Sequence, residues 1–194
     1  KIKEQRKGGE RITLYGKIVF DGKDITELHP SERVKEGLVL CRERHPIFPE
    51  SDLVENLRIA GYLRKRSEVS STIEYVFDLF PTLLRLKTRK AGFLSGGEQQ
   101  MLTIGMALMV KPKLLLLDEP LLGLSPIMQK TLVDAILKIR KEAGLTIVVT
   151  EQFARPILPV IDHGYVVENG MLSLDGPGLE LMENPEVKAA YFGV

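Results

Sequence analysis

The sequence predicts an α/β fold in which helices cover a parallel sheet. Two short runs, Leu114–Leu117 and Thr146–Thr150, have the length and apolar composition of buried parallel strands. Between them, residues 127–143 repeat apolar side chains at helical spacing, and Gly144 ends that pattern. A further strand is predicted for residues 164–167, followed by a turn at residues 168–170. Strands that alternate with helices of this length are typical of a layered α/β sheet.

Composition excludes several classes of protein. A chain of 194 residues suits one domain, or one domain with a small subdomain, and 44% hydrophobic residues can form a core. The net charge of +1 gives no overall field that attracts nucleic acid or an acidic membrane. The single cysteine, Cys41, excludes a disulfide framework and a Cys-rich metal site, and is typical of a reducing compartment. No run approaches the roughly 20 apolar residues of a membrane-spanning helix, and no signal peptide is visible.

The first 41 residues are predicted to contain short strands and one short helix after a polar end. Residues 1–9 are basic and polar and end in two glycines, which indicates a frayed end or a junction. Residues 12–20 alternate and are rich in β-branched and aromatic side chains, so one or two strands are expected, followed by a turn at Asp21-Gly22. A short helix should begin at Pro30, and residues 37–41 have the composition of a buried strand.

From residue 46 to residue 110 the pattern becomes helical. A first helix is predicted after Ser51-Asp52, which can cap it. A second is predicted for residues 71–83, broken near Pro81, and a third for residues 98–109. A helical block that separates two strand-rich stretches indicates an inserted subdomain.

The third of these helices is preceded by a candidate phosphate site. Ser95, Gly96 and Gly97 would present backbone N–H groups and a hydroxyl at the positive end of the helix dipole, and Glu98 follows in the first turn. Taken alone, this tetrapeptide is better explained as an ordinary helix cap.

Two adjacent carboxylates, Asp118 and Glu119, form a second candidate site at the end of a predicted strand. Open α/β sheets bind ligands at this end of their strands. One carboxylate can hold Mg²⁺ or its water shell, and the other can polarise a water for attack on a phosphate. A solvated acidic strand end explains this pair, taken alone, equally well.

The order of these motifs resembles the C-terminal two-thirds of an ABC-transporter ATPase subunit. The matching segments are the signature motif (Leu94–Gln100), the Walker B strand (Leu114–Asp118), the catalytic acid (Glu119) and the D-loop (Leu122–Pro126). Shorter sequence segments narrow the resemblance to ATPase subunits of branched-chain amino acid importers. These segments are Gly22–Thr26, Glu36–Val39, Val54–Leu57, Glu98–Leu102, Thr150–Ala154, Asp162–Gly170 and Asn184–Gly193.

The resemblance implies a P-loop ATPase-type layered sheet core, incomplete at its N-terminus, with an inserted α-helical signature subdomain. The core would comprise residues 1–48 and 111–194, and the helical subdomain residues 49–110. It also implies a homo- or heterodimer of ATPase subunits that meet head to tail and enclose two ATP molecules.

Roles for single residues follow from the resemblance. Ser95, Gly96, Gly97 and Glu98 would contact the γ-phosphate of the ATP that the partner subunit holds. Asp118 would support Mg²⁺ and Glu119 would act as general base or position the water. Three further positions are Gln152, where most members carry the switch histidine, Glu43 in place of the Q-loop glutamine, and Gly123, Leu124 and Ser125 in the D-loop.

The implied partners are transmembrane permease subunits, and no nucleic acid is expected. The loop around Glu43 would couple nucleotide state to those subunits through the surface from Phe48 to Leu57. The implied location is the cytoplasm, peripheral on the inner face of the cell membrane. The transported solute cannot be identified from the sequence, because other subunits select it.

The phosphate-cradling loop of such ATPases, Gly-x-x-x-x-Gly-Lys-Ser/Thr, does not occur in these 194 residues. In the nearest case, Gly16-Lys17, an isoleucine replaces the hydroxyl residue and Arg11 replaces the first glycine. We expect either a truncation or a missing segment before about Gly16. A broken parent gene is the less favoured explanation, because the remaining motifs are intact. The 194 residues alone are therefore expected to be inactive.

Two alternatives to an importer ATPase stay open. A soluble DNA-associated ABC ATPase would also carry a signature helix and an Asp-Glu strand end, but it would place a long coiled coil before the signature. Residues 49–93 contain no sustained heptads, which argues against it. The other alternative is a non-catalytic ABC module that only completes the ATP site of a partner.

Overall fold

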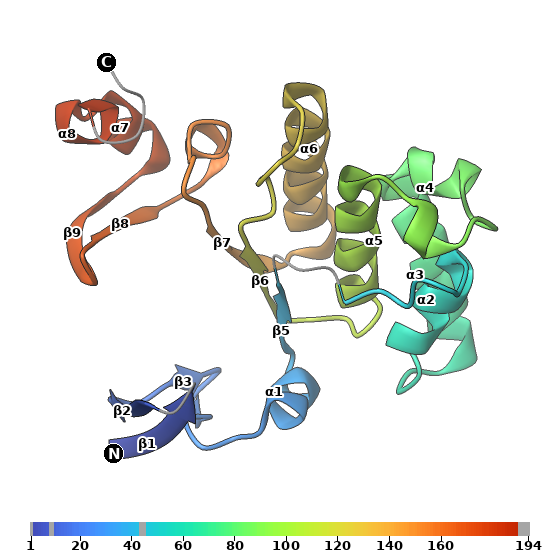
Figure 1. The fold of residues 1–194 in the computed structure, drawn as a ribbon, viewed down its shortest axis with the longest axis horizontal. Helices are drawn as coiled ribbons and strands as arrows, with labels where there is room; N and C mark the ends of the chain where they lie inside the picture. Colours follow the sequence, from blue (N-terminus) through green and yellow to red (C-terminus); the bar gives the residue numbers. More distant parts are fainter. Residues whose placement is uncertain (1, 8–9, 43–45, 190–194) are drawn as a thin grey trace. The chain divides into compact units, whose positions relative to one another are not determined.

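The computed structural model describes residues 2–7, 10–42 and 46–189, which form two compact units, residues 1–37 and 38–194. Figure 1 colours the first unit in blue. In this unit, β1 (Ile2–Lys7) pairs antiparallel with β2 (Glu10–Tyr15). The prediction of a frayed end or junction is therefore wrong for residues 2–7. A strand rich in charged residues lacks the apolar signal on which the prediction depended, yet its backbone pairs fully with a neighbour.

A tight hairpin and a short helix complete the first unit. β3 (Val19–Phe20) pairs with β4 (Lys23–Asp24) through Asp21 and Gly22, whose φ angles are 50° and 75°. Two successive positive φ angles are typical of the hairpin turn that an Asp-Gly pair favours, so the predicted turn is confirmed. The helix α1 (Pro30–Glu36) begins at the predicted proline.

Three parallel strands in the order β5-β6-β7 form the sheet of the second unit. They are β5 (Leu38–Cys41), β6 (Leu114–Asp118) and β7 (Thr146–Thr150), as the sequence predicts. Alternate residues of β5 and β6 point into the core, where Leu115 and Leu117 are almost fully buried. The last residue of β6, Asp118, lies opposite the last residue of β7, Thr150.

The predicted helical block contains four α-helices and a 3₁₀ turn. Its elements are α2 (Leu53–Ala60), α3 (Arg66–Leu79), α4 (Pro81–Arg85), η1 (Ala91–Phe93) and α5 (Gly96–Leu108). The second helix begins five residues before the predicted Ser71, because Glu68 accepts a hydrogen bond from the backbone N–H of Lys65 and so caps it. It ends at Leu79, and Pro81 opens the next helix, where its missing N–H costs nothing.

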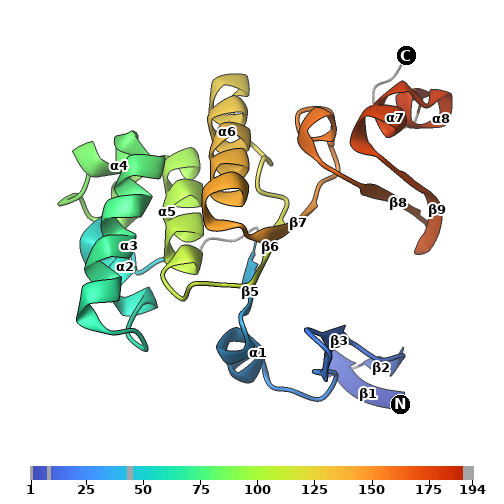
Figure 2. The same cartoon turned by 180° about the vertical axis from the view of Figure 1, so that it is seen from behind.

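The helix α5 is the centre of the second unit. Figures 1 and 2 show it between α6 (Pro126–Ala143) and the helices α2 and α3. Its Leu102 and Ile104 are completely buried. Gly105 allows a close approach, since an added Cβ would lie 2.7 Å from Cγ1 of Val76 on α3.

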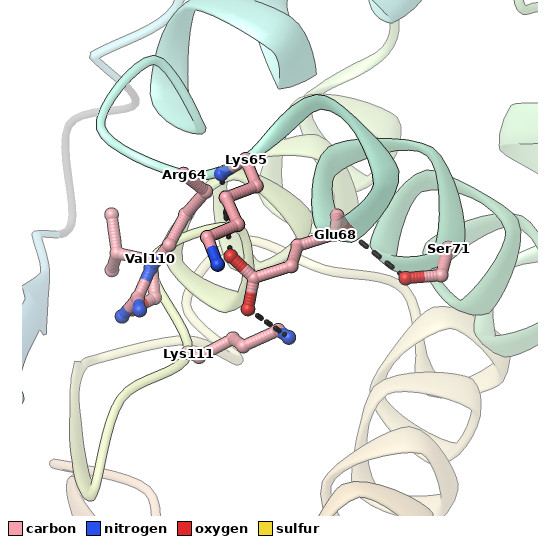
Figure 3. Close-up of polar contacts among 6 residues, drawn as sticks. All are labelled: Arg64, Lys65, Glu68, Ser71, Val110 and Lys111. Carbon is pink, nitrogen blue, oxygen red and sulfur yellow. Dashed lines mark hydrogen bonds and ion pairs between the residues drawn. The ribbon is translucent and has the colours of Figure 1, made fainter.

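A polar cluster ties the start of α3 to the loop that follows α5 (Figure 3). Lys111 Nζ lies 2.8 Å from Glu68 Oε1, and the guanidinium of Arg64 donates to the carbonyl of Val110. The hydrogen bond from Lys111 is the largest cause that lowers the pKa of Glu68, and the hydrogen bond from the Lys65 N–H and the positive charges of Lys111 and Arg64 act in the same direction. The cluster therefore links two segments that are more than forty residues apart in the sequence.

The rest of the second unit follows β7. A 3₁₀ turn, η2 (Leu158–Val160), leads to the antiparallel pair β8 (Gly164–Glu168) and β9 (Met171–Gly176), and then to α7 (Gly178–Glu183) and α8 (Pro185–Val187). The strand at 164 and its turn at 168–170 are predicted by the sequence, whereas β9, α7 and α8 are not. A largely apolar groove has a volume of about 620 Å³. Residues of α6 and β7 line it together with residues of η2, β8, α7 and α8. Among the helices that the structure describes, none combines the length and hydropathy needed to cross a membrane.

Replacing Gly105 by alanine is expected to lower the free energy of unfolding by about 1 kcal/mol. Overpacking against the stiff Val76 side chain costs about 1–3 kcal/mol, and the gain in helix propensity of about 1 kcal/mol offsets only part of it. Denaturant unfolding followed by circular dichroism measures the change. Gly96→Ala on the same helix is the control, because no heavy atom lies within 4 Å of its added Cβ. Equal stability of the two variants would contradict the close packing of α5 on α3.

Cys41 is expected to react with thiol reagents only after unfolding. Its side chain is 2% exposed, burial raises the pKa of its thiol to about 12, and its Sγ donates to the carbonyl of Thr103 on α5 at 3.9 Å. Since the thiolate is the reactive form, a disulfide reagent such as DTNB should modify the folded chain far more slowly than the denatured chain. Equal rates in both states would show that α5 does not cover β5.

Candidate functional site

The carboxyl ends of β6 and β7 bring the first site residues together. Thr150 Oγ1 donates to Asp118 Oδ1 at 2.8 Å, and the Asp118 side chain is exposed to solvent. Parallel strands end at the same edge of a sheet, so this position is where an α/β sheet binds its ligands. The contact orients the carboxylate without removing it from water.

Glu119, the next residue, has a left-handed backbone. Its φ is 45°, an unfavourable value for a residue with a side chain, which persists only where the surroundings hold it. The N–H of Glu119 donates to the carbonyl of Thr150 at 2.9 Å, and its own carbonyl accepts from Leu122 at 3.2 Å. Asp118 and Glu119 therefore belong to a tight turn that the end of β7 fixes.

Glu151, the residue that follows β7, contacts the same turn. Its Oε1 accepts a hydrogen bond from the backbone N–H of Leu121 at 2.8 Å, and its side chain is partly buried. Burial raises the pKa of Glu151 to about 7, and the negative charge of Glu119 acts in the same direction, while the hydrogen bond from Leu121 opposes both. Glu119 and Glu151 thus place two carboxyl groups at the same turn.

The predicted D-loop follows this turn directly. Gly123 has a φ of 70°, which a glycine adopts without strain. The Leu121 carbonyl accepts from Gln129 Nε2 at 3.3 Å, and the Ser125 hydroxyl accepts from the N–H of Met128 and caps α6. The first turn of α6 and its cap therefore hold the loop on one side.

The predicted signature residues form the tip of α5. Ser95 is the N-cap: its hydroxyl accepts from the N–H of Glu98 at 3.4 Å, and Glu98 Oε2 accepts from the N–H of Ser95 at 2.7 Å. Ser95 and Gly96 are exposed, whereas Gly97 is buried. A serine hydroxyl and a glycine backbone are thus available to solvent at the positive end of a helix dipole.

Gly97 connects the helix tip with the D-loop. A Cβ added at Gly97 would lie 2.6 Å from Cε of Met128 and 3.5 Å from Cδ2 of Leu124. The absence of a side chain at this position allows the first turn of α5 to pack on the loop and on the start of α6. The signature tip therefore packs directly against the D-loop and the start of α6.

The remaining predicted positions lie outside this cluster of contacts. Gln152 is exposed and follows Glu151 directly. Glu43 lies outside the described residues. Within the described ranges, no group of three or more His, Cys, Asp or Glu side chains could hold a metal ion by itself. Asp118 is the exposed carboxylate at the strand end, so a cation there would need further ligands from a bound molecule or water.

Three residues that fix predicted functional segments were given no role from the sequence. Thr150 and Glu151 anchor the acidic turn, and Asn56 fixes the segment at 48–52. The completely buried Asn56 side chain accepts from the N–H of Phe48 at 2.7 Å and donates to the carbonyls of Phe48 and Asp52 at 3.0 and 2.9 Å. The anchoring roles of Thr150 and Glu151 could have been suspected from their position at the end of a predicted strand. A single asparagine gives no comparable indication in the sequence.

Comparison with known proteins agrees with the fold and the motif order. The family model described as "ABC transporter" matches residues 9–122. The branched-chain amino acid transport ATP-binding protein BraG of Pseudomonas aeruginosa is 39% identical over 178 residues, which cover 92% of this chain and 76% of the relative. A probable branched-chain amino acid transport ATP-binding protein, LivF of Archaeoglobus fulgidus, is 36% identical, with 92% and 76% covered.

Solved structures of ATP-binding cassettes have the same fold. The ADP conformation of one such cassette of an ABC transporter superposes with a TM-score of 0.79 at 28% identity, covering 94% of this chain and 78% of the other. A nucleotide-free cassette gives a TM-score of 0.76 at 27% identity, with 91% and 77% covered. The predicted α/β core of the P-loop ATPase type is therefore confirmed. The chain belongs to the ABC transporter family, and it is an ATP-binding subunit similar to those of branched-chain amino acid transporters.

Proposed function

We propose that this chain is the ATP-binding and ATP-hydrolysing subunit of an importer for branched-chain or related amino acids. The observation that supports it most directly is the packing of the α5 tip, whose Ser95 and Gly96 are exposed, on the D-loop that follows the acidic turn. The similarity to BraG and LivF supports the class of solute. ATP-driven closure of a head-to-tail dimer would power transport.

In this proposal the tip of α5 acts across the dimer. The Ser95 hydroxyl and the Gly96 backbone are exposed, so they can reach the γ-phosphate of an ATP that the partner subunit holds. Gly97 and Glu98 support that role, since one allows α5 to pack on the D-loop and the other completes the cap. The D-loop residues Gly123, Leu124 and Ser125 would lie at the same interface.

The acidic turn would carry the chemistry. Asp118 offers a solvent-exposed carboxylate, a hard oxygen ligand of the kind Mg²⁺ prefers, and ATP phosphates with water would complete the coordination. Bound Mg²⁺ would neutralise charge on the phosphates. Glu119, held by Thr150, would orient or deprotonate the attacking water. Gln152, exposed beyond β7, would donate an amide hydrogen bond near the γ-phosphate without titrating.

The proposed partners are a second ATPase subunit and transmembrane permease subunits. Residues 1–48 and 111–194 would belong to the ATPase core and residues 49–110 to the helical subdomain that carries the signature. The loop around Glu43 and the surface from Phe48 to Leu57 would transmit the nucleotide state, and Asn56 keeps that surface in one shape. The subunit would work in the cytoplasm, on the inner face of the membrane.

Glu119→Gln should retain ATP binding and abolish turnover in a parent protein that supplies the phosphate loop. The amide preserves size and hydrogen bonding but cannot accept a proton, so the rate of ATP hydrolysis should fall by about 10²–10⁴-fold. Phosphate release measures turnover, and ATP-dependent dimer formation measures binding. Glu180→Gln, an exposed change on α7, is the matched control. Normal hydrolysis by the Glu119 variant would remove that residue from the proposed role.

A polypeptide of these 194 residues is expected to bind ATP weakly or not at all by itself. The sequence contains no Gly-x-x-x-x-Gly-Lys-Ser/Thr loop, whose backbone N–H groups and lysine hold the phosphates. Calorimetric titration with Mg-ATP measures the affinity. A submillimolar dissociation constant would show that other groups of the chain hold the phosphates. If the chain instead stimulates hydrolysis by a loop-containing partner while binding no ATP itself, the non-catalytic module becomes the better description.

A further inference from the structure

The turn from Asp118 to Leu122 depends on the end of β7 for its hydrogen bonds. Pro120 has no N–H, so Glu119 and Leu121 supply the backbone donors between Asp118 and Leu122. The Glu119 N–H is held by the carbonyl of Thr150 at 2.9 Å, and the Leu121 N–H by the carboxylate of Glu151 at 2.8 Å. The last residue of β7 and the residue after it therefore accept the hydrogen bonds of both N–H groups.

The turn also holds an unfavourable conformation. Glu119 has a φ of 45° although it carries a side chain, and such a conformation reverts unless neighbouring contacts hold it. The Leu121 side chain is 2% exposed and its carbonyl accepts from Gln129, so Leu121 is fixed on its other sides. The bond from Leu121 to Glu151 is the contact that joins this fixed residue to β7.

A carboxyl group is an unusual choice for this task. Holding one backbone N–H requires only an acceptor, and Glu151 is partly buried close to the charge of Glu119. Burying a second carboxyl there costs free energy that a neutral acceptor would avoid. What the turn uses is the length of the side chain, which reaches from the residue after β7 to Leu121, and its acceptor oxygen, not its charge.

We propose that Glu151 is a positioning residue for Glu119. By holding the Leu121 N–H, its side chain keeps the Asp118–Leu122 turn in the conformation that directs the Glu119 carboxylate toward the site. The effect on ATP hydrolysis rests on the proposed function, whereas the effect on the turn does not.

Amide hydrogen exchange tests the turn in the 194-residue chain. The Leu121 N–H should exchange slowly in the wild type and in Glu151→Gln, whose amide oxygen is still an acceptor, and at least about tenfold faster in Glu151→Leu, which has none. Glu151→Asp, which is one methylene shorter, should resemble the leucine variant. Glu180→Gln on α7 is the control for a distant charge. Rapid exchange of Leu121 in the wild type, a measurement that needs no variant, would overturn the proposal.

Kinetics in a parent protein with the phosphate loop separates positioning from general stability. Glu151→Leu should lower kcat for ATP by about 10²-fold and change KM by less than about twofold, and Glu151→Gln should restore kcat. An unchanged kcat in Glu151→Leu, or a fall that Glu151→Gln shares although Leu121 stays protected, would overturn the positioning role. If the wild type itself hydrolyses no ATP, the proposed function fails, and the exchange pattern still decides whether Glu151 holds the turn.

Discussion

The parallel register between β6 and β7 determines the geometry of the whole site. It sets Asp118 opposite Thr150, and every later contact of the acidic turn follows from that alignment. A shift by one residue would exchange the faces of β7 and separate the Thr150 hydroxyl and the Glu151 carboxyl from their partners. The partly buried residues of β7, Ile147 and Val149, resist such a shift, because a change of face would exchange them with the exposed residues of that strand. Packing of apolar side chains thus fixes the position of polar groups at the strand ends.

A second constraint is the close approach of helices at two glycines of α5. Gly105 lets the helix pack on Val76, and Gly97 lets its first turn pack on Leu124 and Met128. One rigid helix therefore connects the interior of the helical block with the D-loop. A displacement of the block would be transmitted to the signature tip, since the helix between the two contacts is largely buried.

Much of the fold could be predicted because its elements carry local patterns. Apolar runs revealed β5, β6 and β7, and the Asp-Gly and Asn-Gly pairs revealed two turns. The prediction missed β1, whose charged residues are stabilised by backbone pairing, and β9, α7 and α8, whose burial depends on contacts with distant residues such as Leu158. The motifs for the signature and the acidic pair were visible in order along the chain. The anchoring roles of Thr150 and Glu151 were not, because they depend on a strand register that no local pattern specifies.

The outer edge of β7 has a consequence for the behaviour of the polypeptide in solution. In the described part of the chain β7 hydrogen-bonds to β6 alone, it borders the apolar groove, and Val148 on it is 47% exposed. An unpaired, apolar edge is a template on which any extended peptide can add a strand. Purification at low protein concentration, with solubilising additives, would keep such edges from adding to one another before they meet a physiological binding partner.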